Sequence, residues 1–169
     1  GSSLPDCSWI IISLPFYFRV FGPVFSSINM CSNGWVGLCA SNSTNTGVGF
    51  LLPNAIAPNN VIHGVTADLD LRTATGGTLE YFEDGIAPNR QFVISYNNVK
   101  FLSGGGNVTF QVIMKETTNQ IEIHTSSCTN TTLPKAQGVE NSAGTVANTV
   151  TGRNNTTNWT GTGYVNSYQ

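Results

Sequence analysis

Four cysteines are the residues whose type and spacing could support the most chemistry in this sequence. Cys31 and Cys39 enclose the segment CSNGWVGLCA, and the other two are Cys7 and Cys128. Zinc and thioredoxin-like sites need C-x-x-C pairs, and none is present. The even number favours two disulfides in an oxidising compartment, with buried free thiols as the alternative. Three connectivities remain open. Cys31 lies two residues before the Asn33-Gly34 turn and Cys39 lies five residues after it, which disfavours a disulfide between them across the turn. We prefer Cys31 with Cys128 and Cys7 with Cys39.

The two histidines, His63 and His124, are the imidazoles that could act as general bases. His124 alternates with apolar residues beside Glu122, which is typical of a solvated histidine on a strand. His63 lies in VIHGVTADLD, and we interpret it as a buried or hydrogen-bonded structural residue. Neither accompanies a serine or cysteine nucleophile motif. We therefore expect a protein that is not an enzyme.

Carboxylates offer a candidate metal site. Asp68 and Asp70 alternate with leucines in ADLDL, so both project from one face of a strand end, and Asp84 closes a nearby strand before Gly85. Hard oxygen ligands at loop edges are how calcium is held in extracellular β-domains. The alternative is that these carboxylates satisfy backbone amides of their own loops. We keep Asp68, Asp70 and Asp84 as a candidate calcium site.

Tryptophan is the residue type that could contact a sugar ring. Trp35 follows the Asn-Gly turn directly, and Trp159 lies in a polar tail rich in Asn and Thr. An exposed indole stacks on sugars, whereas a buried one fills a core. Core packing is the main interpretation for both, and Trp35 and Trp159 are the candidate ligand-binding residues if they are exposed.

The elements that must position these residues are strands. Turn residues recur every eight to twelve positions, and apolar residues alternate between them. In the segment 107–116 the residues on one face are Val108, Phe110, Val112 and Met114. No window shows the 3.6-residue period of a capped helix. The sequence predicts an all-β, antiparallel, two-sheet β-sandwich or jelly roll with disulfides, formed by one domain over residues 1–169.

Composition excludes two classes of partner. Only 9% of residues are charged, against about 25% in an average protein, and the net charge is -2 with seven Lys and Arg. No basic stripe is available for nucleic acid. The apolar run from Trp9 to Phe18 is interrupted by Pro15 and is far shorter than the roughly 20 residues of a membrane span. We interpret Gly1-Ser2 as an expression scar and the chain as a fragment of a larger protein.

Five segments in order resemble a known family. They are LPFYFRVFGPVFSSINMCSNGWVGL, PNNVIHGVTADLD, LEYFEDGIAPNRQFVISYNNV, VTFQVIMKETTNQIEIH, and QGVENSAGT with GRNNTTNWT. Their order is similar to that in the nidogen-like β-sandwich modules, with an SNG turn, of large secreted and surface proteins of Bacteroidota, such as gliding-motility adhesins of the SprB kind. The SNG turn falls at Ser32 to Gly34, where Asn-Gly accepts the backbone of a tight hairpin. One departure is Val65-Thr66, where the family commonly has bulky aromatic residues.

The resemblance implies a scaffold or attachment role without an active site to carry over. We therefore expect a non-catalytic adhesion or spacer module at the cell surface or outside the cell, next to other domains of the same parent chain. A carbohydrate-binding module that contacts a surface polysaccharide, with or without calcium, is the first alternative. An accessory domain of a secreted peptidase is the second.

Overall fold

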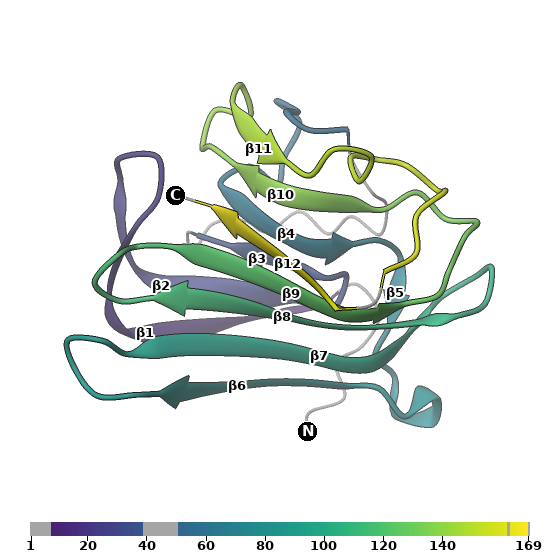
Figure 1. Cartoon of the computed structure of the whole chain (residues 1–169), viewed down its shortest axis with the longest axis horizontal. Helices are drawn as coiled ribbons and strands as arrows, with labels where there is room; N and C mark the ends of the chain where they lie inside the picture. The colour runs from purple at the N-terminus through teal and green to yellow at the C-terminus, as the bar shows by residue number, and fades with distance from the viewer. Residues whose placement is uncertain (1–7, 39–50, 162, 169) are drawn as a thin grey trace.

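Two antiparallel sheets form the fold in the computed structural model, which describes residues 8–38, 51–161 and 163–168 (Figure 1). The first sheet has the order β1 (Trp9–Arg19), β2 (Val24–Cys31), β3 (Trp35–Gly37), β4 (Val61–Thr66), β10 (Ala136–Glu140) and β11 (Ala147–Thr149). The second has the order β12 (Tyr164–Tyr168), β9 (Ile121–Cys128), β8 (Asn107–Lys115) and β7 (Gln91–Phe101), and both β6 (Thr78–Asp84) and β5 (Leu69–Asp70) pair with β7. The predicted all-β, two-sheet antiparallel architecture is confirmed.

Helical structure is limited, in the described part of the chain, to one 3-10 turn at Thr73–Thr75. In the same part no helix is long and apolar enough to cross a membrane.

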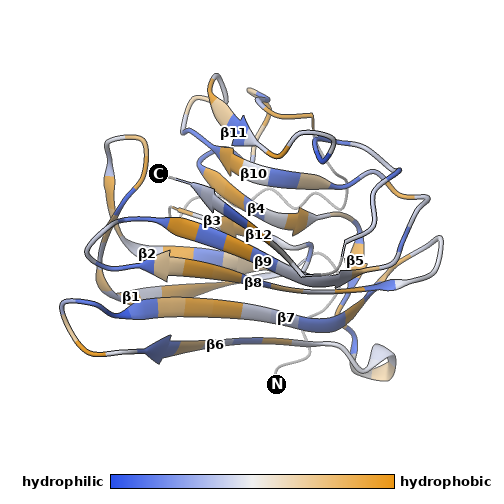
Figure 2. Ribbon diagram, viewed as in Figure 1, coloured by the Kyte–Doolittle hydropathy of each residue, from blue (hydrophilic) through white to orange (hydrophobic). Residues whose placement is uncertain are grey.

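The core lies between the two sheets and follows the alternation seen in the sequence. On β8 the inward residues Val108, Phe110, Val112 and Met114 are all fully buried. Phe110 stacks on Tyr96 of β7 with ring centroids 4.4 Å apart, and apolar residues of β1 and β2 close the same cluster from the other sheet. Figure 2 shows this as hydrophobic segments along β7, β8 and β9 interrupted by hydrophilic ones. Burial of one apolar face per sheet is the main source of stability for such a fold.

The SNG turn joins the two sheets. It lies between β2 and β3, and Gly34 has a φ of 80°, which favours glycine. The side chain of Asn33 accepts a hydrogen bond from Leu69 N at 3.0 Å, and Leu69 begins β5 of the second sheet. The Gly34 carbonyl accepts from Gly64 N at 3.1 Å and from Val65 N at 3.3 Å on β4. The predicted hairpin is confirmed, and its turn is fully buried rather than solvent-exposed.

One preferred disulfide is wrong. Within the described part of the chain no bond joins Cys31 to Cys128. Ile28 and Met30 of β2 belong to the core between the sheets, whereas Cys31 packs in a separate cluster with Trp35 and Val61. Because side chains alternate across a strand, the first sheet separates Cys31 from Cys128, which lies in the main core. Cys7 and Cys39 lie outside the described residues, so the prediction that this chain forms disulfides stays a prediction.

Cys128 is expected to carry an unreactive thiol. It is 2% exposed, and burial raises the pKa of its thiol, so little nucleophilic thiolate forms at neutral pH. We expect alkylation by iodoacetamide to be at least roughly tenfold slower in the folded protein than in urea. Peptide mass spectrometry without reduction checks this, and a Cys128 peptide recovered in disulfide linkage would contradict it.

Candidate functional site

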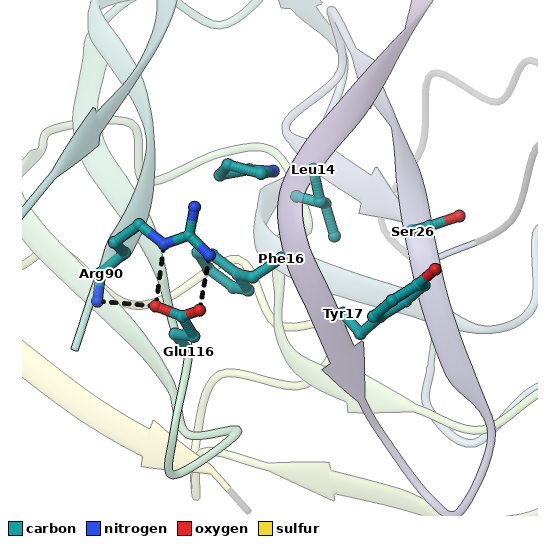
Figure 3. Close-up of a pocket in the computed structure, with 7 residues that line it drawn as sticks. Leu14, Phe16, Tyr17, Ser26, Arg90 and Glu116 are labelled. Atoms are coloured by element: carbon teal, nitrogen blue, oxygen red, sulfur yellow. Dashed lines mark hydrogen bonds and ion pairs between the residues drawn. The ribbon is translucent and has the colours of Figure 1, made fainter. Parts of the chain in front are cut away.

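An open groove crosses the edge of the first sheet at β1. Its volume is about 440 Å³. The residues that line it are Leu14, Pro15, Phe16 and Tyr17 of β1, Ser26 of β2, and Arg90 and Glu116 from the second sheet's side (Figure 3). Arg90 immediately precedes β7 and Glu116 immediately follows β8. The antiparallel pairing of Gln91 with Lys115 therefore places these two side chains next to each other.

Arg90 and Glu116 form a fixed, planar ion pair in the groove wall. Glu116 Oε1 accepts from Arg90 Nη2 at 2.6 Å, and Oε2 accepts from Nε at 2.9 Å and from the Arg90 backbone N at 3.1 Å. These hydrogen bonds lower the pKa of Glu116 and raise the pKa of Arg90, so both groups are charged at neutral pH. The guanidinium carbon also lies 5.5 Å from the centre of the Phe16 ring. Bidentate geometry of this kind presents fixed donors and acceptors to a ligand.

Tyr17 borders the same groove, with its exposed ring on the other side of β1 from Arg90 and Glu116. Its side chain is 76% exposed, whereas its neighbours Phe16 and Phe18 are buried because they lie on the opposite face of the strand. Figure 3 shows Tyr17 beside Ser26, across β1 from Arg90 and Glu116. A large aromatic ring left in solvent next to fixed polar groups is typical of a binding surface.

A second, smaller hollow adjoins the groove. Its volume is about 170 Å³, and Arg90 and Glu116 line both hollows. The remaining lining residues are polar: Asn89, Gln91, Lys115, Thr117 and Thr118. Asn89 comes from the turn between β6 and β7, Thr117 and Thr118 come from the turn between β8 and β9, and the other two are the strand-end residues Gln91 of β7 and Lys115 of β8. The ion pair thus lies where the two hollows meet, and the Tyr17 ring lies across β1 from it.

The three candidate calcium ligands are not brought together. Asp70 pairs with Lys100 on β7 and Asp84 pairs with Gln91 on the same strand. Nine residues of strand separate those two positions, which is roughly 30 Å. Asp70 instead accepts hydrogen bonds from Arg72 Nε at 2.8 Å and Nη2 at 2.6 Å, which lower the pKa of its carboxyl. Among the described residues no group of three His, Cys, Asp or Glu could hold a metal ion.

The two candidate tryptophans are both packed. Trp35 is fully buried on β3 and offers no face to a ligand. Trp159 is 7% exposed and lines a hollow of about 610 Å³ with Arg153 and Asn166. Its ring contacts the Arg153 guanidinium carbon at 4.5 Å and the Lys135 Nζ at 5.3 Å. Cations therefore occupy the ring faces on which a sugar would stack, and the core interpretation holds for both residues.

The histidines lie as the sequence suggests. His63 is fully buried on β4, and its Nδ1 lies 2.9 Å from Thr66 Oγ1. His124 is partly exposed on β9, with its Nε2 2.9 Å from Glu122 Oε2. Both interpretations are confirmed, since the first is a buried, hydrogen-bonded residue and the second faces solvent.

Sequence reasoning missed the groove residues Tyr17, Arg90 and Glu116. Tyr17 stands in the apolar run from Trp9 to Phe18, whose composition favours burial for most of its residues. The alternation of Phe16, Tyr17 and Phe18 was the signal that could have placed the tyrosine outside. Arg90 and Glu116 are 26 residues apart, and only the register of the hairpin that links β7 to β8 brings them together.

A family model described as NIDO related matches residues 6–168. No curated protein and no solved structure matches this chain.

Proposed function

The chain belongs to the NIDO-related family, and on this premise we propose that it is a non-catalytic attachment module of a larger secreted or surface-exposed protein. The observation that carries the proposal is the groove at β1, where exposed Tyr17 and the fixed Arg90–Glu116 pair offer a surface for binding. Resemblance of the sequence to gliding-motility adhesins of the SprB kind supports a bacterial cell-surface protein as the parent. Other domains of that parent chain would then be its neighbours.

The chemistry of the groove supports binding rather than turnover. A carboxyl that acts as general acid needs a raised pKa, so that it holds a proton near neutral pH. The hydrogen bonds from Arg90 lower the pKa of Glu116 instead. Glu116 is the one carboxylate among the described residues that line the two hollows. We therefore assign Glu116 a role in holding a ligand.

Tyr17→Ala is expected to reduce attachment without loss of stability. The ring is 76% exposed, so its removal deletes a contact surface and little packing. Retention of the purified domain on immobilised bacterial surface polysaccharide should fall at least about tenfold, the range of a central aromatic contact. Val165→Ala is the matched control, because Val165 is 58% exposed on β12, outside the groove.

The outcome contrary to attachment through the groove is equal retention of wild type and Tyr17→Ala at matched melting temperature. Turnover of peptides, esters or glycosides by the isolated domain would instead contradict the non-catalytic role.

A further inference from the structure

We propose that the ligand of this module is a neutral oligosaccharide segment that lies across both hollows, with one sugar on Tyr17 and later sugars against Asn89 and Thr118. This inference rests on the proposed attachment function and names its ligand class and its site. Each step follows from the lining of the two hollows.

The shape of the site favours a chain-like ligand. Arg90 and Glu116 line both hollows, so the two hollows adjoin at the ion pair, and the Tyr17 ring lies over the edge of β1 from there. A small molecule would fill one half and leave the other to water. A linear ligand contacts both halves and gains affinity with each added unit until the surface is covered.

The two halves offer the two kinds of contact that a sugar chain needs. The larger half has the exposed Tyr17 ring and Pro15, and an aromatic face packs against the apolar C–H face of a pyranose. The smaller half has the amide and hydroxyl groups of Asn89, Gln91, Thr117 and Thr118, which both donate and accept hydrogen bonds. Sugar hydroxyls also do both, so each would find a partner there.

The ion pair can hold hydroxyls at the junction of the two halves. Two of the five N–H groups of Arg90 donate to Glu116. The Arg90 Nη1 forms a longer ion pair of 3.6 Å with Glu83, which also raises the pKa of Arg90. Donors of the guanidinium therefore remain for a ligand, held in a fixed plane by Glu116 on one side and the Phe16 ring on the other.

The charges around the groove favour a neutral ligand. Arg90 is paired with Glu116, and Lys115 is paired with Glu122. Each cation that lines the site therefore has an anionic partner, and a charged ligand would have to break a pair to gain one. Binding of a neutral sugar through stacking and hydrogen bonds should also change little with salt, because screening acts on separated charges.

An extended peptide fits the edge of β1 less well. A peptide that adds to a sheet needs a regular row of backbone N–H and C=O groups. On β1 the pairing register shifts between Ser13 and Phe18, and Pro15 lies inside that stretch and has no N–H. The row is therefore interrupted where the groove crosses it.

The test is binding of the whole chain to an array of neutral glycans, followed by a length series of the best binder from monosaccharide to hexasaccharide. We expect affinity to rise at least about tenfold from the monosaccharide to the tetrasaccharide and to persist in 1 M NaCl. Tyr17→Ala should abolish binding at every length, and Tyr17→Trp should restore it. Asn89→Ala should leave the monosaccharide unaffected and remove much of the gain with length.

Two results would overturn the proposal. One is binding to no neutral glycan on the array, and the other is preferential binding of polygalacturonate or of an unstructured peptide that is lost in high salt. Retention on bacterial surface polysaccharide separates this failure from that of the attachment function. A domain that is retained there through Tyr17 yet binds no neutral oligosaccharide is an attachment module with another ligand. A domain that is not retained there and binds no neutral oligosaccharide contradicts both proposals.

Discussion

Gly34→Ala is expected to lower the free energy of unfolding by at least about 3 kcal/mol, which combines left-handed strain with overpacking. Gly34 has a φ of 80°, a region that costs an alanine roughly 1–2 kcal/mol. An added Cβ would also lie 2.2 Å from the Val65 carbonyl oxygen, which belongs to the backbone of β4 and cannot move aside alone. The Gly34 carbonyl also accepts two backbone hydrogen bonds from β4. A shift of the turn away from Val65 would therefore break these bonds.

Gly105→Ala is the matched control for this substitution. Gly105 has a φ of 70°, but no described heavy atom lies within 4 Å of its ideal Cβ position. It therefore bears only the conformational part, about 1–2 kcal/mol. Urea denaturation of the two variants measures the difference. Equal losses would show that the contact between Gly34 and Val65 is unimportant and that the turn adjusts.

Acid is expected to destabilise the domain through His63, below the pH at which most surface histidines titrate. The imidazole is fully buried, and its Nε2 has no hydrogen-bond partner among the described residues. Burial lowers the pKa of His63 to about 3, from 6.5 in the unfolded chain. Between these values the unfolded chain binds a proton that the folded protein does not, so stability falls as pH falls. The expected loss is about 1.4 kcal/mol per pH unit, and of the order of 4 kcal/mol by pH 3.

His63→Asn removes this titration and keeps a polar group near Thr66 Oγ1. The variant loses packing volume at every pH, so the informative quantity is the difference in unfolding free energy between wild type and variant as pH changes. That difference should be constant from pH 8 to 7 and should shrink steadily below pH 6.5. Above pH 4.5 most paired carboxylates keep their charge, which leaves His63 as the cause. A difference that stays constant down to pH 4.5 would contradict the buried, neutral imidazole.

The fold was predictable because its information is local. Alternation along β8 and β9 needs only neighbouring residues, and Asn33-Gly34 specifies its turn by backbone preference alone. The candidate site was not predictable, because its residues come together only through the pairing register of strands that are distant in sequence. Arg90 and Glu116 become neighbours only when β7 pairs with β8.

The wrong assignments have the same physical origin. Asp68 and Asp70 are close in sequence, but Asp84 is separated from them by the length of β7. The preferred Cys31–Cys128 pair failed because parity and spacing do not say on which face of a sheet a thiol lies. For Trp35 the main interpretation, core packing, is confirmed, although the turn that it follows is of a kind that is normally exposed.

The outer strands β1 and β6 also affect whether copies of this domain associate through their sheet edges. The outer strand β6 exposes Glu80, Glu83 and Asp84 beside the half-exposed Tyr81 and Phe82, and β1 has its shifted register and Pro15. Strands with such features resist merging with the edge of another sheet, by repulsion of like charges in one case and by a broken hydrogen-bond row in the other. Domains crowded on a surface or strung along one filament would therefore stay separate instead of aggregating through these edges, and every groove would remain open to its own ligand.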